Sequence, residues 1–220
     1  MIILKTPDEI AVMAQASKVV AETLQILQKV VRAGITTDEL DRLAEEEIRS
    51  RGAKPAFKGY RNYPKTLCAS VNDQVVHGIP SKRVLKEGDI IGLDLGAIVG
   101  GFYGDSAVTV PVGRTAEQYA RLVQVTEEAM YLGIEQAVVG HRLSDISYAV
   151  QKHVESAGYS VVTEFVGHEL AGSCTKSLRC RIMGSLGKDH GCRQGWFLPS
   201  NRWSIWAPPP SRFLRIAGRR

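Results

Sequence analysis

The chain contains 220 residues, of which 44% are hydrophobic and 23% are charged, and its formal net charge is +5. This length and balance are typical of one globular domain and exclude an intrinsically disordered chain. The N-terminus has no apolar stretch behind a basic start, and no 18 apolar residues run together, so we expect a soluble chain that is not exported. Four cysteines without a CxxC pair favour reduced thiols and a cytoplasmic location.

The positive charge is concentrated in the last quarter of the chain. Residues 1–168 contain 18 Lys and Arg against 21 Asp and Glu, whereas residues 169–220 contain 10 against 2. The same tail holds all three tryptophans and three of the four cysteines. Two unlike compositions therefore meet near His168.

A pair of helices is predicted at the start of the chain. Thr6 supplies a capping hydroxyl, a proline follows it, and Glu9 places a carboxylate three residues after the cap. Apolar residues then recur every three to four positions as far as Gly34. A second stretch of this kind begins near Thr37 and ends at Gly52.

Residues 115–158 repeat this plan at an offset of 106 positions. They predict a helix from about Thr115 to Val138 and a second helix capped by Ser144, and Gly140 and Gly158 correspond to the two glycines of the first pair. We interpret the match as an internal duplication. Two similar amphipathic helix pairs without common origin are the alternative.

Between the helical pairs the apolar period changes to that of strands. Residues 67–71 precede a turn at Asn72, and residues 89–95 lead through a glycine pair to a return segment over residues 102–112. Each half is therefore expected to be α+β, with helices packed on an antiparallel sheet. Past His168 neither period is clear, and we expect no regular element there.

Two aspartates lie on the predicted hairpin. If Val99 and Gly100 form its two-residue turn, Asp94 pairs directly with Asp105, and their Cβ atoms lie about 4.5–5.5 Å apart. Two carboxylates this close cannot both ionise in a half-buried place without a cation, so the pattern favours a site for divalent metal ions. An exposed hairpin with two solvated acids is the alternative.

Two histidines occupy positions of interest. His168 follows an apolar segment and would lie at a strand end, either as a third metal ligand or as a hydrogen-bonded structural residue. His77 lies in a turn that Gly78 and Pro80 make rigid, which suits a positioned proton donor, although a turn histidine without a role is also compatible with the sequence.

Four segments together resemble type I methionine aminopeptidases. They are Tyr60 to Asn72, the turn His77-Gly78-Ile79-Pro80, Gly88-Asp89-Ile90 with Asp94, and Gly101 to Asp105. The resemblance extends from about Lys5 to His168. It implies a pseudo-twofold pita-bread fold of class α+β, with a helix pair and an antiparallel sheet in each half and the second half truncated. It also implies two divalent metal ions (Co²⁺, Mn²⁺, Fe²⁺, Zn²⁺ or Ni²⁺) in the sheet.

The resemblance also implies roles for individual residues. Asp94 matches a bidentate ligand of one metal ion, Asp105 matches a bridging carboxylate, and His168 matches the imidazole ligand. His77 matches a catalytic histidine that contacts the substrate near the scissile amide. The walls of a methionine side-chain pocket are matched by Tyr60, Tyr63 and Cys68.

The implied reaction removes N-terminal methionine from nascent proteins, best when the second residue is small. We expect a monomer that acts near the ribosome, without a membrane or a specific nucleic acid. A non-catalytic binding module on the same fold and a relative of the Xaa-Pro peptidases are the alternatives, the second disfavoured by the His77-Gly78-Ile79-Pro80 turn. Nucleic-acid binding through the arginines and tryptophans of the tail is a third.

The tail departs from the family pattern and is compatible with a shifted reading frame. Decoded one base out of phase, residues 169–184 permit the string VGRKLHEEPQVPNYG, and residues 193–204 permit AGMVLAIEPMVN. Both strings resemble the continuation of the family, which supplies a second histidine and two glutamate ligands. We hypothesise that a single-base deletion generated residues 169–220, and we expect the chain as written to bind metal weakly and to have little activity.

Overall fold

The computed structural model describes residues 5–162, 166–168, 179–181 and 205–206, the last three segments through their backbone. The elements in chain order are α1 (Pro7–Val30), α2 (Thr37–Ser50), β1 (Lys54–Pro55), the 3₁₀ helix η1 (Tyr60–Asn62), β2 (Leu67–Val71), β3 (Ile90–Val99), β4 (Phe102–Pro111), α3 (Glu117–Glu135), α4 (Leu143–Ser156), β5 (Ser160–Val161), β6 (Val166–His168), β7 (Arg179–Arg181) and β8 (Ile205–Trp206).

Both helices of the first pair begin with a reciprocal cap. The Thr6 hydroxyl accepts the Glu9 amide at 3.3 Å, and the Thr6 amide donates to the Glu9 carboxylate at 2.8 Å. Thr36 and Glu39 make the same two bonds at 3.2 and 2.8 Å. Each cap satisfies amides that the first helical turn leaves without partners. The predicted helix starts are therefore confirmed.

The central sheet is built around β3. β1 and β2 pair with one edge of β3 and β4 pairs with the other, all antiparallel. Gly100 and Gly101 form the turn between β3 and β4, with φ of 55° and 84°, and this double left-handed conformation is the one that a tight hairpin turn requires. The predicted turn at Val99 and Gly100 is therefore wrong by one residue. Within the described residues, no strand pairs with the outer edge of β4.

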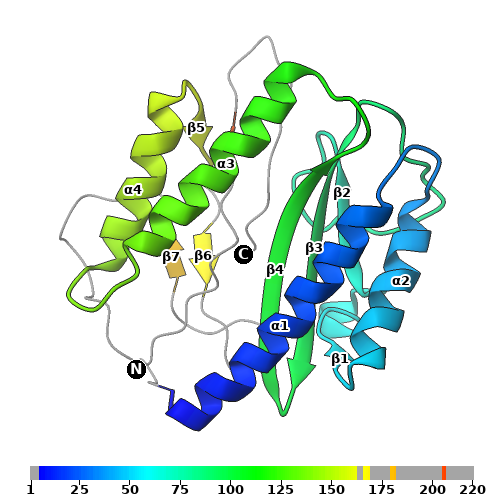
Figure 1. Ribbon diagram of the computed structural model, residues 1–220, viewed down its shortest axis with the longest axis horizontal. Helices are drawn as coiled ribbons and strands as arrows, with labels where there is room; N and C mark the ends of the chain where they lie inside the picture. Colours follow the sequence, from blue (N-terminus) through cyan, green and yellow to red (C-terminus); the bar gives the residue numbers. More distant parts are fainter. Residues whose placement is uncertain (1–4, 163–165, 169–178, 182–204, 207–220) are drawn as a thin grey trace.

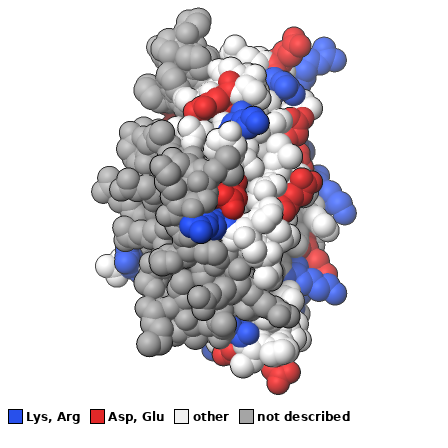
Figure 2. Space-filling model, turned by 90° about the vertical axis from the view of Figure 1, so that its left-hand side faces the viewer, with Lys and Arg blue, Asp and Glu red and all other residues white. Residues whose placement is uncertain are grey.

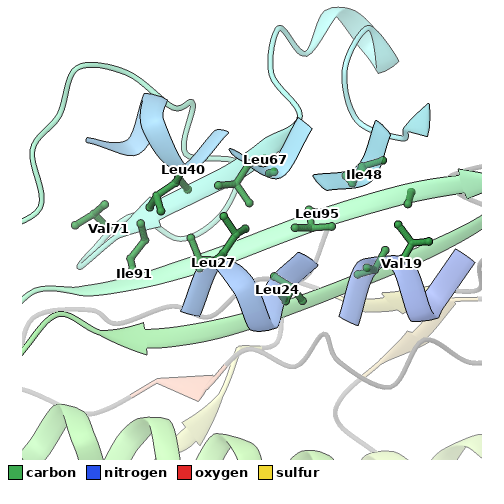
Figure 3. Close-up of a cluster of buried hydrophobic side chains, with 14 of the residues drawn as sticks. Val19, Leu24, Leu27, Leu40, Ile48, Leu67, Val71, Ile91 and Leu95 are labelled. Carbon is green, nitrogen blue, oxygen red and sulfur yellow. The ribbon is translucent and has the colours of Figure 1, made fainter. Parts of the chain in front are cut away.

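The main hydrophobic core lies between the first helix pair and one face of this sheet (Figure 3). α1 and α2 direct apolar side chains toward the sheet, and β2 and β3 direct alternate residues back toward the helices. The labelled members are Val19, Leu24, Leu27, Leu40, Ile48, Leu67, Val71, Ile91 and Leu95. Alternation along a strand leaves the intervening residues on the opposite face, where the aspartates lie.

The helix α1 also has the length and apolar character needed to cross a membrane, as judged by composition alone. Its buried residues include Met13, Val20 and Leu27, each with no exposed surface. Figure 1 shows the helix lying across β3 and β4. Packing against the sheet explains the apolar character of α1, because a helix in a hydrophobic core can be as long and as apolar as one that crosses a membrane.

The internal repeat is confirmed by the positions of the elements. α2 and α4 have bounds that differ by 106 residues at both ends, and so do β1 and β5. Gly34 and Gly140 have φ of 90° and 99°, and Gly52 and Gly158 have φ of 72° and 82°. The two helix pairs therefore end and turn in the same way. Figure 1 shows α3 and α4 on one side of the long β3–β4 hairpin, α2 on the other side and α1 across it.

Two details of the second half differ from the prediction. α4 is capped by Arg142, whose amide donates to the Asp145 carboxylate at 2.8 Å, and Ser144 is instead a buried residue of the first turn. Strands β7 and β8 pair with β6 and β5, although no regular element was predicted beyond His168. Such short strands need only backbone hydrogen bonds, which any sequence without proline can supply.

The charges on the described surface are mixed. On the side of the molecule drawn at the left of Figure 1, Figure 2 shows acidic and basic side chains interspersed around uncharged ones. Interspersed charges of this kind are typical of a solvated surface.

Candidate functional site

Two buried carboxylates form the centre of the site. Asp94 in β3 is 5% exposed and Asp105 in β4 is 9% exposed. Asp105 lies opposite Gly96, and Asp94 lies opposite Ala107. The direct pairing predicted from the sequence is therefore wrong. The aspartates are diagonal neighbours, because the turn is displaced by one residue and the pairing consequently shifts by two. A shift of two preserves the face of the sheet, so both side chains still share it.

The donor chemistry of this pair fits divalent metal ions. Buried carboxylates are costly unless they are paired or bind a cation, and two like charges on one sheet face raise that cost further. Carboxylate oxygens are also ligands that hard divalent ions accept.

The described residues do not contain a complete set of metal ligands. Within the described residues, no group of three or more His, Cys, Asp or Glu side chains is arranged so that it could hold a metal ion. The predicted third ligand, His168, is the last residue of β6, whose backbone pairs with β7. Figure 1 draws these two strands between the second helix pair and β4. The side chain of His168 lies outside the described part of the chain.

An apolar wall adjoins the carboxylates on the same face of the sheet. Cys68 of β2 lies directly opposite Asp94 and has no exposed surface. It belongs to a cluster with buried Ala56 and Phe57, against which Tyr60, Tyr63, Ile98 and Tyr103 pack. We call these seven residues the aromatic wall. The predicted pocket residues Tyr60, Tyr63 and Cys68 are thus brought together beside Asp94.

Two aromatic members of the aromatic wall, Phe57 and Tyr103, were missed by sequence reasoning. Tyr103 stands two positions before Asp105 on the same strand, and this period could have placed it on the carboxylate face. Phe57 gives no such signal, because it precedes an irregular loop. It packs over Gly96, where a Cβ atom would lie 2.9 Å from Phe57 Cε1. Gly96, opposite Asp105, therefore leaves the space that the phenyl ring occupies.

Tyr63 connects the wall to the backbone of the site. Its hydroxyl donates toward the carbonyl oxygens of Leu67 and Gly78, at 2.9 and 3.1 Å. Burial, followed by the neighbouring Cys68 and the negative charge of Asp94, raises the pKa of Tyr63 far above its ordinary value. The phenol is therefore held as a hydrogen-bond donor throughout the physiological range.

The raised pKa of Tyr63 predicts how the protein titrates at alkaline pH. A raised folded pKa stabilises the fold fully below the unfolded phenol's pKa of about 10, and this contribution is lost as pH rises above that value. We therefore expect the near-ultraviolet phenolate titrations of the unsubstituted chain and of Tyr63→Phe to coincide until the protein unfolds. One additional phenolate in the unsubstituted chain before unfolding would contradict the assignment.

The turn that carries His77 is fixed against the free edge of β2. The Ala69 amide donates to the Gly78 carbonyl at 2.8 Å, and the Gly78 amide donates to the Ser70 hydroxyl at 3.2 Å. His77 is half-buried and has a left-handed backbone with φ of 57°. A non-glycine residue adopts this conformation only where its surroundings determine it. These contacts support the conformation of the turn, and its rigidity stays a prediction.

Gly78 is expected to tolerate no side chain. A Cβ atom there would lie 2.1 Å from the Ala69 carbonyl oxygen, and backbone would have to move. We expect Gly78→Ala to lower the free energy of unfolding by about 2–4 kcal/mol in urea denaturation. Gly52→Ala is the control, because that glycine has open space and only a positive φ, for a cost of about 1 kcal/mol. Equal decreases in the free energy of unfolding in the two variants would contradict the close contact between Gly78 and the Ala69 carbonyl.

A separate cavity of about 540 Å³ lies between α1, β4 and α3. Its lining includes Leu24, Ala107, Thr109 and Met130. It follows the outer edge of β4 and includes neither aspartate, so it is not part of the site described above.

Comparison with known proteins gives a consistent result. Residues 11–176 match the model of metallopeptidase family M24. The methionine aminopeptidase of Clostridium acetobutylicum is 52% identical over 169 residues, which is 76% of this chain and 68% of that protein. Methionine aminopeptidase 1 of Bacillus subtilis is 50% identical over 168 residues, with the same coverage of both chains.

Solved structures agree with these relatives. A crystal structure of methionine aminopeptidase from Rickettsia prowazekii superposes with a TM-score of 0.89 at 33% identity, covering 100% of this chain and 90% of that one. A prolidase from Pyrococcus furiosus superposes with a TM-score of 0.76 over 97% of this chain and 64% of that one, but at 19% identity. The second likeness concerns the fold alone.

Proposed function

The chain belongs to the methionine aminopeptidases of metallopeptidase family M24, and from this membership we propose that it hydrolyses the first peptide bond of chains that begin with methionine. The reaction is expected to be fastest when the second residue is small. The observation that carries the proposal is the buried pair Asp94 and Asp105 on the same sheet face as the aromatic wall. A charged reaction centre and an apolar side-chain pocket thereby adjoin each other.

The proposed metal ligands are Asp94, Asp105 and His168. The two aspartates would hold the divalent ions through carboxylate oxygens, and His168 would add an imidazole nitrogen. When bound, such ions activate a water molecule and polarise the scissile carbonyl. Two ions drawn from Co²⁺, Mn²⁺, Fe²⁺, Zn²⁺ or Ni²⁺ are proposed, and the donor set does not distinguish among these metals.

The remaining residues bind and orient the substrate. Tyr60, Tyr63 and Cys68 would enclose the methionine side chain and exclude water from it, as a half-buried apolar surface favours. His77 would contact the peptide near the scissile amide as a hydrogen-bond donor. The fixed turn that carries His77 supports this role, because a positioned donor requires a backbone that does not move.

The activity of the chain as written is proposed to be impaired. Within residues 169–220 only Glu169, Asp189 and His190 could be ligands, and none of them stands in the motifs in which the family carries its second histidine and two glutamates, so the coordination shell would remain incomplete. We propose that residues 1–168 are an incomplete catalytic domain and that residues 169–220 arose by a frameshift. Sequencing the underlying DNA tests this origin directly.

The setting of the reaction follows from the substrate. Nascent chains that begin with methionine are found at the ribosome, so we propose a cytoplasmic monomer that acts near it. The mixed charges visible in Figure 2 are compatible with a solvated subunit.

A panel of short peptides tests the function. Purified chain with Mn²⁺ or Co²⁺ is compared on Met-Gly, Met-Leu, Leu-Gly and Xaa-Pro peptides, beside a version with residues 169–220 replaced by the alternate-phase peptide. We expect methionine release from Met-Gly alone, strong in the replaced version and weak in the chain as written. Cleavage of Xaa-Pro peptides would identify the prolidase-like alternative. Metal-dependent peptide binding without cleavage by either version would identify the non-catalytic module.

A further inference from the structure

One polar face of α2 consists of three carboxylates that point at the loop before β2. Asp38, Asp41 and Glu45 follow one another at helical spacing, so they share this face. Asp41 is 5% exposed, and its Oδ1 atom accepts the amides of Thr66 and Leu67, each at 2.9 Å. A buried carboxylate with two backbone donors is a strong anchor, because hydrogen bonds to a charged group in a poorly solvated place are strengthened.

Two lysines of the same loop complete the attachment. Lys65 Nζ lies 2.6 Å from Asp38 Oδ1 and 3.7 Å from Asp41 Oδ2. Lys58 Nζ lies 2.6 Å from Glu45 Oε2. The hydrogen bond that Lys65 donates to Asp38, together with the negative charge of Asp41, raises the pKa of Lys65, so the ammonium remains charged where it contacts the helix. The loop over residues 58–66 is therefore held by α2 at both ends.

This loop carries two tyrosines of the aromatic wall for which we propose contact with the substrate. Tyr60 and Tyr63 lie within it, and the Tyr63 hydroxyl donates to the carbonyl of Leu67, the residue whose amide Asp41 binds. Cys68 follows directly. A displacement of the Thr66–Leu67 backbone would therefore move Tyr63 and Cys68 together.

The same helix also holds the turn of His77. The Thr37 hydroxyl donates to the Ser81 carbonyl at 3.0 Å and accepts the Ser81 amide at 2.9 Å. The Tyr63 hydroxyl lies 3.1 Å from the Gly78 carbonyl, so the two loops also meet each other. α2 is thus a common support for both substrate-facing loops.

The internal repeat shows that the fold itself does not require these carboxylates. At an offset of 106 residues, the positions of Asp38, Asp41 and Glu45 are occupied in α4 by Ser144, Ser147 and Gln151. Ser147 is as buried as Asp41, and its hydroxyl donates to the Leu143 carbonyl of its own helix. The two helices nevertheless have equal length. The acidic face is therefore specific to the half that carries the aromatic wall.

We propose that Asp41, supported by Asp38 and Glu45, is a positioning residue that fixes the aromatic wall and thereby sets the selectivity for the N-terminal side chain of the substrate. The selectivity part rests on the proposed peptidase function. The positioning part does not, because it concerns contacts within this chain. The carboxylate acts through the backbone of Thr66 and Leu67 and does not touch the substrate.

The reactivity of Cys68 measures the position of the wall without any catalysis. In a background with the tail cysteines Cys174, Cys180 and Cys192 changed to serine, a thiol reagent reports on Cys68 alone, which is fully buried. We expect Asp41→Ser, which introduces the residue found at the equivalent position Ser147 of α4, to raise the labelling rate of Cys68 at least about tenfold. Asp41→Asn keeps an oxygen for both amides and should stay within about threefold of the parent. An unchanged rate in Asp41→Ser would overturn the proposal.

Two controls separate positioning from a general loss of stability. Glu46→Ser removes an exposed carboxylate from the same helix and should leave the rate unchanged. Ile146→Val weakens the separate core of the second helix pair. If that variant, at a comparable fall in Tm, accelerates labelling as much as Asp41→Ser, labelling reports global unfolding and the positioning role is wrong. Lys65→Gln is a milder variant in case Asp41→Ser does not fold, and it too should accelerate labelling.

Protection of Cys68 by amino acids tests selectivity. In the chain with residues 169–220 replaced by the alternate-phase peptide, which serves here as the parent, and with Mn²⁺ present, methionine should protect Cys68 at a lower concentration than leucine or alanine does. Asp41→Ser should lower the ratio of these protecting concentrations at least about fivefold. If Asp41→Ser labels Cys68 faster but keeps the preference for methionine, Asp41 positions the aromatic wall, and the proposed effect on selectivity is wrong. No preference for methionine in the parent would contradict the proposed substrate, and the labelling rates would still decide the positioning role.

Discussion

The Asp105→Asn substitution is expected to raise the free energy of unfolding of the metal-free chain at neutral pH by about 1–2 kcal/mol. In the chain with residues 169–220 replaced by the alternate-phase peptide, it is also expected to abolish stabilisation by Mn²⁺. Asp94 and Asp105 are both buried and lie diagonally on one sheet face, a separation of about 7 Å in an antiparallel pair. At an effective dielectric constant of about 20, two unit charges at that distance repel by roughly 2 kcal/mol. The amide removes this repulsion and one metal ligand together.

Thermal unfolding with EDTA and with Mn²⁺ measures both effects. The control is Asp73→Asn, which neutralises an exposed carboxylate in the turn after β2 and should change neither quantity. Stabilisation by a ligand requires that it bind the folded chain better than the unfolded one. A metal-free Asp105→Asn chain less stable than the parent would show that Asp105 has a structural role instead. An unchanged response to Mn²⁺ would remove Asp105 from the metal site.

The pairing of the two aspartates shows which features of a hairpin can be predicted from its sequence. The sequence places both on one hairpin and one face, because side chains alternate with period two whatever the register. The register depends in addition on which pair forms the turn, and the β-branched Val99 does not readily adopt the positive φ that such a turn requires. In the structure Gly100 and Gly101 form the turn, because both turn residues need a positive φ and glycine adopts that conformation most readily.

Local signals in the sequence predicted the helix starts and the turns better than the contacts that form the site. The caps at Thr6 and Thr36 and the repeated glycines depend on neighbouring residues alone, so the sequence contains them in full. Phe57 and Asp41 depend on contacts between segments far apart in the chain. Nothing near Asp41 in the sequence indicates that its carboxylate binds the amides of Thr66 and Leu67, because that contact exists only after α2 packs beside β2.

Replacing residues 169–220 with the alternate-phase peptide is expected to restore the metal centre. The chain as written should bind less than one Mn²⁺ ion with useful affinity, whereas the replaced chain should bind about two. The physical reason is the ligand count, because Asp94, Asp105 and His168 leave each ion short of protein donors, and the restored glutamates and histidine would supply them. We expect kcat/KM for a Met-Gly peptide to rise at least about a hundredfold.

The replaced chain should also be more stable and less prone to aggregate. Within the described residues, the outer edge of β4 has no paired strand, and the cavity beside it is lined by side chains of α1, β4 and α3. Unpaired strand edges invite association between molecules, and additional strands of the second half would cover them. Light scattering during thermal unfolding, compared with a chain truncated after His168, separates this effect from simple removal of the basic tail.

Metal stoichiometry decides between the two origins of the tail. If a frameshift produced residues 169–220, only the replaced chain should retain two equivalents of Mn²⁺ after dialysis, as measured by elemental analysis. Asp94→Asn in the replaced chain should lower this value, since the restored ligands act on the same centre. Two equivalents in the chain as written would mean that its own tail supplies donors, and the frameshift would then have no functional consequence. Equal and low values in both chains would contradict the alternate reading itself, because the decoded glutamates would not reach Asp94 and Asp105.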